Sequence, residues 1–183
     1  MKLLFLDRDG VINRFPGKGL YVTSQEQFQF IPGSIQAIAD LTKNGYEIVV
    51  VSNQGCVSRG LISLDALQAM TDRMLSDIRR AGGNIARVMY CVHQTSDRCN
   101  CKKPKTQLFY DALGPRVIAW KDTFFVGDSM EDMEAAQNLG CGKILVLSGR
   151  TQAEDLDDFP VKPDRVCADL LEASQWVQSI KKS

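Results

Sequence analysis

The sequence lacks an excess of charge of either sign, and it has no long hydrophobic run. Its 22 lysines and arginines balance 22 aspartates and glutamates, which argues against a broad basic surface for nucleic acid or anionic membranes. No apolar run approaches the roughly 20 residues of a membrane-spanning helix. The opening run Leu3–Leu6 stops at Asp7, far short of the apolar segment of a signal peptide. We therefore expect a cytoplasmic protein that binds neither nucleic acid nor a membrane.

Internal repeats, low-complexity tracts and domain linkers are also missing from the 183 residues. A chain of this length is typical of one domain and can hold a core without disulfide bonds. The acidic stretch Glu154–Asp158, followed by Pro160 and Pro163, is predicted to be a surface loop. We expect a monomer with one domain over residues 1–183.

Short apolar segments alternate with helical patterns along this domain. Five of these segments are rich in Val, Ile, Leu and Phe and end at turn residues, as buried strands do. The predicted strands are Lys2–Leu6, Glu47–Ser52, Val88–Cys91, Thr123–Gly127 and Lys143–Leu147. The predicted helices are Ser34–Lys43, the segment that Ser63 caps and that runs to Arg80, Thr106–Leu113, Glu131–Leu139 and Leu170–Ile180. Such alternation predicts a Rossmann-like α/β domain, a parallel sheet with helices on both faces.

Polar clusters follow three of the predicted strands, at the sheet edge where open α/β proteins bind ligands. They are Asp7-Arg8-Asp9-Gly10, Ser52-Asn53-Gln54-Gly55 and Gly127-Asp128-Ser129. Asp7, Asp9 and Asp128 brought together would repel one another and need a cation, and hard oxygen ligands suit Mg²⁺. A carboxylate beside Mg²⁺ can attack phosphorus, and a second can act as general acid and base. Each aspartate alone could be a turn residue, but all three at strand ends favour phosphoryl chemistry.

Four motifs in order resemble those of the haloacid-dehalogenase-type phosphatases. LFLDRDGVIN resembles the first motif of that family, VVVSNQG the second and VGDSMEDMEAA the fourth, and the third is a lone lysine that Lys103 in CKKPK supplies. The matches extend from Leu3 to Ala136, most of the chain. The resemblance therefore implies a phosphomonoester hydrolase that acts on a small phosphorylated metabolite.

The same resemblance implies a role for each residue of the motifs. Asp7 would be the nucleophile that forms an aspartyl-phosphate, and Asp9 would be the general acid and base. Ser52, helped by the backbone of Asn53, would hydrogen-bond the transferring phosphoryl group. Lys103 would neutralise phosphoryl charge and restrain the Asp7 carboxylate.

The resemblance also implies a magnesium site held by Asp7, the backbone carbonyl of Asp9, and Asp128. Asp132 would either support this site or stabilise the start of its own helix. No large insertion that could build a cap domain follows Ser34–Lys43. The loop 91–101 and the segments 13–24 and 54–61 would then have to shape the pocket.

His93 is the only histidine, and it lies inside the only cysteine cluster. Cys91, His93, Cys99 and Cys101 form a Cys-x-His-x₅-Cys-x-Cys array, which predicts a closed tetrahedral Zn²⁺ site of the structural kind. Free thiols placed at random are the alternative. Zinc would fold the loop 91–101 and so position Lys103 indirectly. Three further cysteines are scattered and are expected to pack in the core: Cys56, Cys141 and Cys167.

A zinc loop that ends in Cys-x-Cys-Lys-Lys-Pro narrows the resemblance to the branch of heptose-1,7-bisphosphate and histidinol-phosphate phosphatases. FIPGSIQAI and SNQGCVSRG resemble this branch too. Lys102 stands where arginine is usual, which keeps the charge but loses a bidentate contact. The loop between His93 and Cys99 is shorter than in typical heptose enzymes and matches the histidinol enzymes better.

Charge near the expected pocket mouth separates the two substrates. Lys18, Arg59, Lys102 and Lys105 would attract a second phosphate and repel the amine of histidinol phosphate. We therefore expect hydrolysis of the 7-phosphate of D-glycero-D-manno-heptose 1,7-bisphosphate, with Arg59 and Lys102 binding the substrate. Histidinol phosphate is the alternative substrate, and a polynucleotide 3′-phosphatase is disfavoured by the zero net charge. A catalytically dead, zinc-stabilised binding module is the alternative of another class, although none of the four motifs has been lost.

Overall fold

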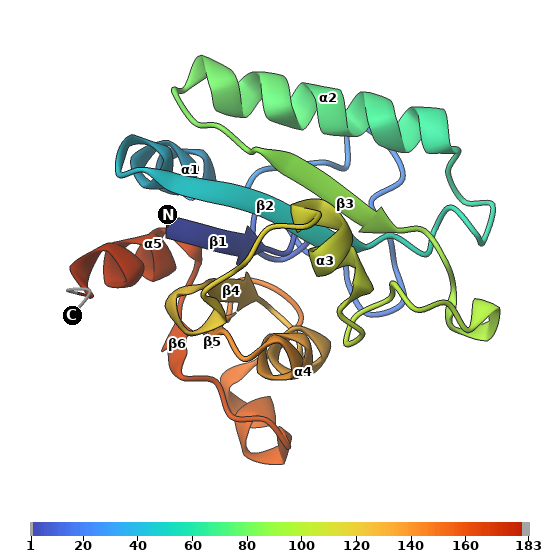
Figure 1. Cartoon of the computed structure of the whole chain (residues 1–183). Helices are drawn as coiled ribbons and strands as arrows, with labels where there is room; N and C mark the ends of the chain where they lie inside the picture. The colour runs from blue at the N-terminus through green and yellow to red at the C-terminus, as the bar shows by residue number, and fades with distance from the viewer. Residues whose placement is uncertain (1, 181–183) are drawn as a thin grey trace.

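The computed structural model describes residues 2–180 and folds them into a six-stranded sheet between two layers of helices (Figure 1). The strands are β1 (Lys2–Leu6), β2 (Tyr46–Asn53), β3 (Arg87–Cys91), β4 (Phe124–Gly127), β5 (Gly142–Val146) and β6 (Arg165–Cys167). They lie in the order β3-β2-β1-β4-β5-β6, and every neighbouring pair is parallel. The predicted α/β class with a parallel sheet is confirmed.

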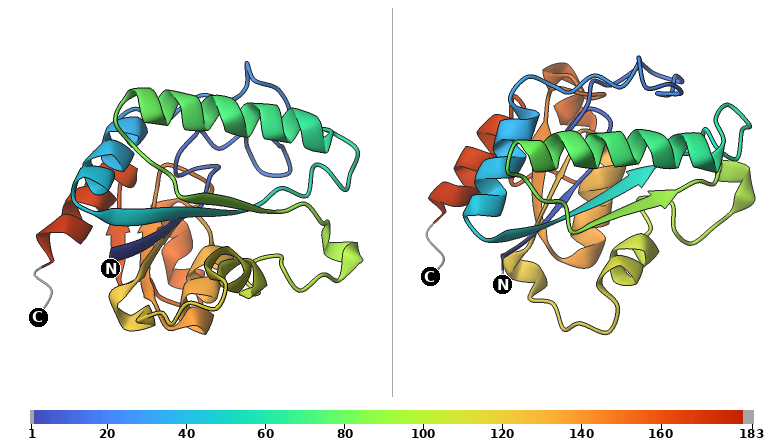
Figure 2. Two further views of the ribbon diagram at one scale, coloured as in Figure 1. Left: turned by 45° about the horizontal axis from the view of Figure 1, so that its top comes forward. Right: turned by 90° about the horizontal axis from the view of Figure 1, so that it is seen from above.

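Helices cover both faces of the sheet, as Figure 2 shows. The helices α1 (Ser34–Lys43), α2 (Leu64–Arg80) and α5 (Leu170–Ser179) pack on one face. On the opposite face, α3 (Gln107–Leu113) and α4 (Met130–Leu139) enclose a second core. Within the described residues, no helix is long and apolar enough to cross a membrane.

The central strand β1 is buried on both faces. Leu4 and Leu6 point into the core beneath α1, α2 and α5, whereas Leu3 and Phe5 point into the core beneath α3 and α4. All four side chains are at most 2% exposed. A continuous apolar run is what such a strand requires. Packing on both faces fixes the point where the strand ends, and Asp7 is the next residue.

The limits of α2 follow the signals in its sequence. The Ser63 hydroxyl accepts a hydrogen bond from the Ala66 N–H at 3.1 Å, which satisfies one of the free donors at the helix start. At the other end, Gly82 has a φ of 85° and donates its N–H to the Arg79 carbonyl at 2.9 Å. Both the predicted start and the predicted end of this helix are confirmed.

Two segments of the C-terminal third differ from the prediction. The edge strand β6 was not predicted, because three residues are too few to show a periodic pattern. The stretch Glu154–Asp158 was predicted to be a loop but lies within a 3-10 helix, Ala153–Asp158. The Asp155 carboxylate accepts the Gln152 N–H at 2.9 Å and caps this turn, a local contact that charge patterning does not reveal.

The chain reverses its direction of winding beside β1. From β1 it builds β2 and β3 on one side and then crosses to β4, β5 and β6 on the other. Such a reversal opens a crevice at the carboxyl ends of the strands. The Asp7 N–H donates to the Val126 carbonyl of β4 at 2.9 Å. The topology thus brings Asp7, after β1, to the same crevice as Asp128, after β4.

Candidate active site

A pocket of about 370 Å³ opens at the carboxyl ends of β1, β2 and β4. Residues 15–21 of the long loop between β1 and α1 form one wall, as expected for the segment 13–24. The segment 54–61 contributes Gly55 to the lining, and the loop 91–101 contributes no residue to it. Six of the residues predicted to catalyse the reaction or bind magnesium line it: Asp7, Asp9, Ser52, Asn53, Lys103 and Asp128. The four motifs, which are up to about 120 residues apart in sequence, therefore meet at one place.

Three buried carboxylates lie close together, and two of them, Asp7 and Asp128, line this pocket. Oxygen atoms of Asp7, Asp128 and Asp132 all lie within 4.8 Å of one another. Burial raises the pKa of Asp7 to about 6, with Lys103 opposing the shift and Asp132 adding to it. Burial and the neighbouring Asp7 carboxylate raise the pKa of Asp128 well above its usual value. When ionised, three carboxylates and one ammonium leave two negative charges, so a site with Asp7 and Asp128 as oxygen ligands fits a divalent cation such as Mg²⁺.

Lys103 is the ammonium group of this cluster and is only 4% exposed. Its Nζ lies 2.9 Å from Asp7 Oδ1 and 2.6 Å from Asp132 Oδ1, and it donates to the Val51 carbonyl at 2.9 Å. Burial alone would lower the pKa of Lys103, but the carboxylates of Asp132 and Asp7 raise it above its usual value. The Asn53 side chain holds the Lys103 backbone, accepting its N–H at 3.0 Å and donating to its carbonyl at 3.2 Å.

Asp132 has both of the functions that its position in the sequence left open. Its Oδ2 accepts hydrogen bonds from the N–H groups of Asp128 and Ser129 and from the Ser129 hydroxyl, at 2.7–3.2 Å. These contacts cap the start of α4. Its other oxygen faces Lys103. Asp132 therefore stabilises its own helix and also orients two neighbouring residues of the cluster.

Asp128 is fixed by a loop that sequence analysis missed. The Arg150 N–H donates to Asp128 Oδ2 at 2.7 Å, and the Thr151 hydroxyl donates to the Asp128 carbonyl at 2.6 Å. A Cβ atom on Gly10 or on Gly149 would collide with the Asp128 carboxylate, so both loops require glycine there. Arg150 also lines the pocket. The signal that could have revealed it is its place in the loop after β5, at the same edge of the sheet.

The Asp9 carboxylate lies in the pocket wall and is bound from behind by protein groups. Arg8, Asn13 and Gln54 donate hydrogen bonds to it. Sequence analysis assigned no role to any of these three side chains. Asp9 is also not part of the group of closely spaced carboxylates, which is consistent with its expected contribution to the metal through its backbone rather than its side chain.

The two residues expected to bind substrate lie in different surroundings. Lys102 lines the pocket, and its Nζ donates to the Thr95 hydroxyl at 2.9 Å. Arg59 is exposed and does not line it. Its guanidinium lies 5.9 Å from the ring of Tyr21, which does line the pocket. Lys18 is a further cation in the lining.

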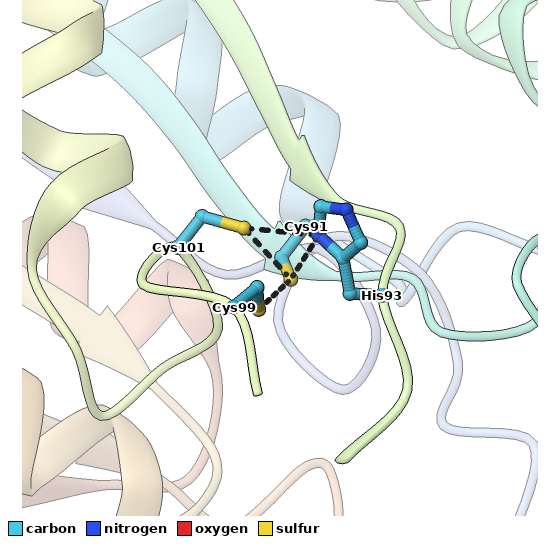
Figure 3. Close-up of side chains that lie close together, drawn as sticks. All are labelled: Cys91, His93, Cys99 and Cys101. Carbon is cyan, nitrogen blue, oxygen red and sulfur yellow. Dashed lines mark hydrogen bonds between the residues drawn. The ribbon is translucent and has the colours of Figure 1, made fainter. Parts of the chain in front are cut away.

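The cysteine and histidine side chains of the loop 91–101 converge on one point (Figure 3). The Sγ atom of Cys91 lies 3.6 Å from that of Cys99 and 3.3 Å from that of Cys101. The Nδ1 atom of His93 lies 3.2 Å from the Cys101 sulfur and 3.8 Å from the Cys91 sulfur. Ligands about 2.3 Å from a tetrahedral zinc ion are roughly 3.8 Å apart. The four side chains therefore fit a structural zinc site.

This loop is joined to the rest of the site at several points. The Asp97 carboxylate accepts hydrogen bonds from the Ser58 hydroxyl at 2.7 Å and from the Gln94 N–H at 2.9 Å. Lys105, expected at the pocket mouth, instead donates to the Cys99 carbonyl. Lys103 lies only two residues after Cys101. The conformation of the loop 91–101 therefore directly affects the position of the buried Lys103 ammonium group.

The remaining cysteines pack in the two cores, as predicted. Cys56 and Cys167 lie beneath α1, α2 and α5, and Cys141 lies beneath α3 and α4. All three are at most 5% exposed. Burial raises the pKa of the Cys141 thiol to about 12, so this side chain behaves as a small apolar group.

A doubly wound sheet with this carboxylate–lysine site defines a haloacid-dehalogenase-like hydrolase. In agreement, a family model described as HAD-hydrolase-like matches residues 100–173. A D-glycero-beta-D-manno-heptose-1,7-bisphosphate 7-phosphatase from Pseudomonas putida is 39% identical over 150 residues, which cover 82% of this chain and 85% of that one. A protein of the same name from Neisseria meningitidis serogroup B is 35% identical over 180 residues, with 97% and 95% covered.

A solved structure is similar over nearly the whole chain. The crystal structure of a D,D-heptose 1,7-bisphosphate phosphatase from B. bronchiseptica, complexed with magnesium and phosphate, matches with a TM-score of 0.90 at 34% identity. The match covers 98% of this chain and 100% of the other. The chain belongs to the D-glycero-D-manno-heptose-1,7-bisphosphate 7-phosphatase family.

Proposed function

We propose that this protein removes the 7-phosphate of D-glycero-beta-D-manno-heptose 1,7-bisphosphate in a Mg²⁺-dependent reaction. The observation that carries the proposal is the 2.9 Å contact of Lys103 with Asp7 in a pocket that also contains Asp9 and Asp128. Relatives with the corresponding name match at 34–39% identity over most of the chain, which supports this substrate.

Asp7 and Asp9 carry the chemistry in two steps. A carboxylate oxygen of Asp7 attacks phosphorus while the bond from phosphorus to the sugar oxygen breaks, and Asp9 gives its proton to that oxygen. Water then attacks the phosphorus of the aspartyl-phosphate while Asp9 takes a proton from the water. The bond between Asp7 and phosphorus breaks, and inorganic phosphate leaves, with Asp7 again a carboxylate and Asp9 again protonated.

Charge on the transferring group is neutralised by the residues around it. The Lys103 ammonium faces the phosphoryl oxygens and keeps the Asp7 carboxylate in position. Ser52 accepts a hydrogen bond from the Gln54 amide at 3.2 Å, which leaves its own proton free for an acceptor such as Asp7 or a phosphoryl oxygen. Mg²⁺, held by Asp7, the Asp9 carbonyl and Asp128, would supply positive charge to the same oxygens.

The walls of the pocket favour a substrate with a second anionic group. Lys18, Lys102 and Arg150 line it, and the acid Glu131, which also lines it, pairs with Arg150 at 3.4 Å. These cations favour the remote phosphate of a sugar bisphosphate over the amine of histidinol phosphate. Arg59 lies beside the ring of Tyr21, outside the pocket lining. It remains a proposed contact for a substrate group that extends past this ring.

Zinc would have a structural role in this enzyme. Cys91, His93, Cys99 and Cys101 would fill all four positions of a tetrahedral ion, so none is left for substrate or water. Such a site needs reduced thiols, which supports a function in the cytoplasm. All proposed catalytic residues come from one chain, which supports function as a monomer.

The substrate is tested by comparing two esters on one enzyme preparation. We expect kcat/KM for the heptose bisphosphate to exceed that for histidinol phosphate at least about tenfold. Activity should be absent when Mg²⁺ is omitted and should return when Mg²⁺ is added. A preference for histidinol phosphate would overturn the substrate and leave the chemistry of Asp7 intact. Absence of phosphate release from either ester would overturn the proposed function.

A further inference from the structure

Arg8 is the bulkiest fully buried side chain in the described part of the molecule. It is the second residue after β1, between the two aspartates Asp7 and Asp9, yet it does not line the pocket. A buried guanidinium is destabilising by several kcal/mol unless it is paired and hydrogen-bonded. Its partners therefore indicate what the residue is for.

The partners of Arg8 fix both its position and its charge. Nε donates to Asp9 Oδ1 at 3.0 Å, and Nη2 reaches both Asp9 oxygens at 2.9 and 3.0 Å. The guanidinium carbon lies 5.8 Å from the ring centre of Phe28 and 5.5 Å from that of Tyr90. Burial would lower the pKa of Arg8, but the Asp9 carboxylate raises it above its usual value. The side chain is thus a permanent, immobile cation that faces Asp9.

Two amide side chains complete the surroundings of this carboxylate. Gln54 donates to Asp9 Oδ2 and Asn13 donates to Asp9 Oδ1, each at 2.8 Å, and both amides are fully buried. The orientation of the Gln54 amide is fixed, because a flip that exchanges its oxygen and nitrogen would break three hydrogen bonds. Its carbonyl accepts a hydrogen bond from Arg8 at 3.0 Å, and its nitrogen donates to Asp9 and Ser52. Both oxygens of Asp9 are therefore held from behind, while 17% of its side chain is exposed.

We propose that Arg8, Gln54 and Asn13 are positioning residues that hold the Asp9 carboxylate in the orientation needed for proton transfer in the pocket. This inference rests on the proposed function, in which Asp9 exchanges protons with the reacting oxygens. A purely structural ion pair gives little stability over apolar residues of the same volume. A carboxylate that transfers protons must be held within hydrogen-bond distance of its substrate in the right orientation. Holding Asp9 in this way is a sufficient reason for the buried ion pair between Arg8 and Asp9.

Displacement of the Asp9 carboxylate should affect p-nitrophenyl phosphate and a sugar phosphate differently. Asp9 acts as an acid in the first step and as a base in the second. p-Nitrophenolate leaves phosphorus without being protonated, whereas a sugar alkoxide requires a proton. Misplacing Asp9 should therefore spare the first step for p-nitrophenyl phosphate, slow that step for a sugar phosphate, and slow the second step for both.

Rapid mixing of the full-length, metal-loaded enzyme with p-nitrophenyl phosphate tests this difference. Arg8→Lys keeps the charge but loses the fork of donors, and Gln54→Met keeps the shape without the amide. We expect both variants to release a burst of about one p-nitrophenol per active site and then turn over at least about tenfold more slowly than wild type. With a sugar phosphate they should show no burst and a similar loss of rate.

Thr71→Val serves as a matched control, because Thr71 is also a buried polar residue. It removes the hydrogen bond of Thr71 to the Tyr90 hydroxyl without touching Asp9, and its kinetics should equal those of wild type. If Gln54→Met and Arg8→Lys lose both steps equally for both esters, or keep wild-type rates, the positioning role is wrong. If the wild type itself hydrolyses neither ester, the proposed function fails instead. Gln54→Met keeps the test valid should Arg8→Lys not fold.

Discussion

Two side chains of the site bind protein groups rather than face the substrate. Asn53 is expected to assist the phosphoryl group through its backbone, and its side chain in addition holds both backbone polar groups of Lys103. Asp132 directs one oxygen to Lys103 and the other to the start of α4. Placement of the ammonium beside Asp7 therefore depends on residues from two different strand ends.

At Asp7, replacement by asparagine removes the proposed nucleophile and one of the mutually repelling carboxylates. We expect Asp7→Asn to lower kcat at least about 100-fold, because an amide cannot form the aspartyl-phosphate. Its melting temperature without Mg²⁺ should be equal to or above that of wild type. Phosphate release and thermal denaturation measure the two effects. Asp111→Asn, at an exposed position of α3, is the control, and more than a hundredth of wild-type activity in Asp7→Asn would contradict nucleophilic catalysis.

The residues that could be predicted from sequence are those that follow strands. Asp7, Ser52 and Asp128 were found because each follows an apolar run, and the carboxyl ends of parallel strands meet at one edge. The place of Arg150 after β5 marks it as a residue of this edge, but its hydrogen bond to Asp128 and the contact of Arg8 with Gln54 could not be predicted, because they depend on which loops meet after folding. Motifs identify the groups that react, whereas the groups that orient them require the three-dimensional contacts.

Among the elements, α2 and its cap were predictable because the signals are local. Ser63 precedes the apolar stripe of the helix, and Gly82 follows it. The strand β6 and the 3-10 helix Ala153–Asp158 were not predictable, since both are short and depend on contacts with neighbouring elements. Phe159 and Val161, after this turn, pack on Met133 and Leu145, and this long-range contact holds the acidic segment against α4 and β5.

The cap of α2 gives a prediction for stability. Ser63→Ala removes the acceptor for the Ala66 N–H and should lower the free energy of unfolding by about 1 kcal/mol. Ser76→Ala, at an exposed interior position of the same helix, is the matched control and should change it by only a few tenths of a kcal/mol. Urea denaturation of both variants measures the difference. Equal effects would mean that the cap does not stabilise the helix.

The loop 91–101 gives a second prediction at this scale. Cys101→Ser removes one of the four converging side chains two residues before Lys103. We expect zinc content to fall from about one ion per chain towards none, and kcat to fall at least about tenfold because Lys103 loses its support. Elemental analysis and phosphate release test this. Cys167→Ser, which changes a buried cysteine outside the loop, should keep its zinc, and wild-type protein without zinc would refute the site.

For the whole molecule, the doubly wound sheet concentrates negative charge at one edge. Strand order brings Asp7 and Asp128 together, and Asp132 joins them from α4. With Lys103 as their ammonium partner, folding leaves these carboxylates under mutual repulsion. A divalent cation that binds the folded state should therefore stabilise the entire domain.

This charge cluster predicts how stability responds to magnesium. At a Mg²⁺ concentration ten times the dissociation constant, binding adds about 1.4 kcal/mol, which raises the melting temperature of a domain of this size by roughly 3–5 °C. Asp128→Asn removes one carboxylate of the cluster and should abolish most of the rise. Thermal denaturation with and without Mg²⁺ measures both. An equal rise in wild type and variant would place the ion elsewhere.

The covalent aspartyl-phosphate on Asp7 is the claim on which the function depends most. It can be tested by quenching the wild-type enzyme in acid during turnover of the heptose bisphosphate and analysing its peptides by mass spectrometry. We expect a phosphoryl group on Asp7 in the tryptic peptide Leu3–Arg8, and none in the same peptide of Asp7→Asn. Continued turnover with this peptide always unmodified, or a phosphoryl group on another residue, would contradict nucleophilic catalysis by Asp7.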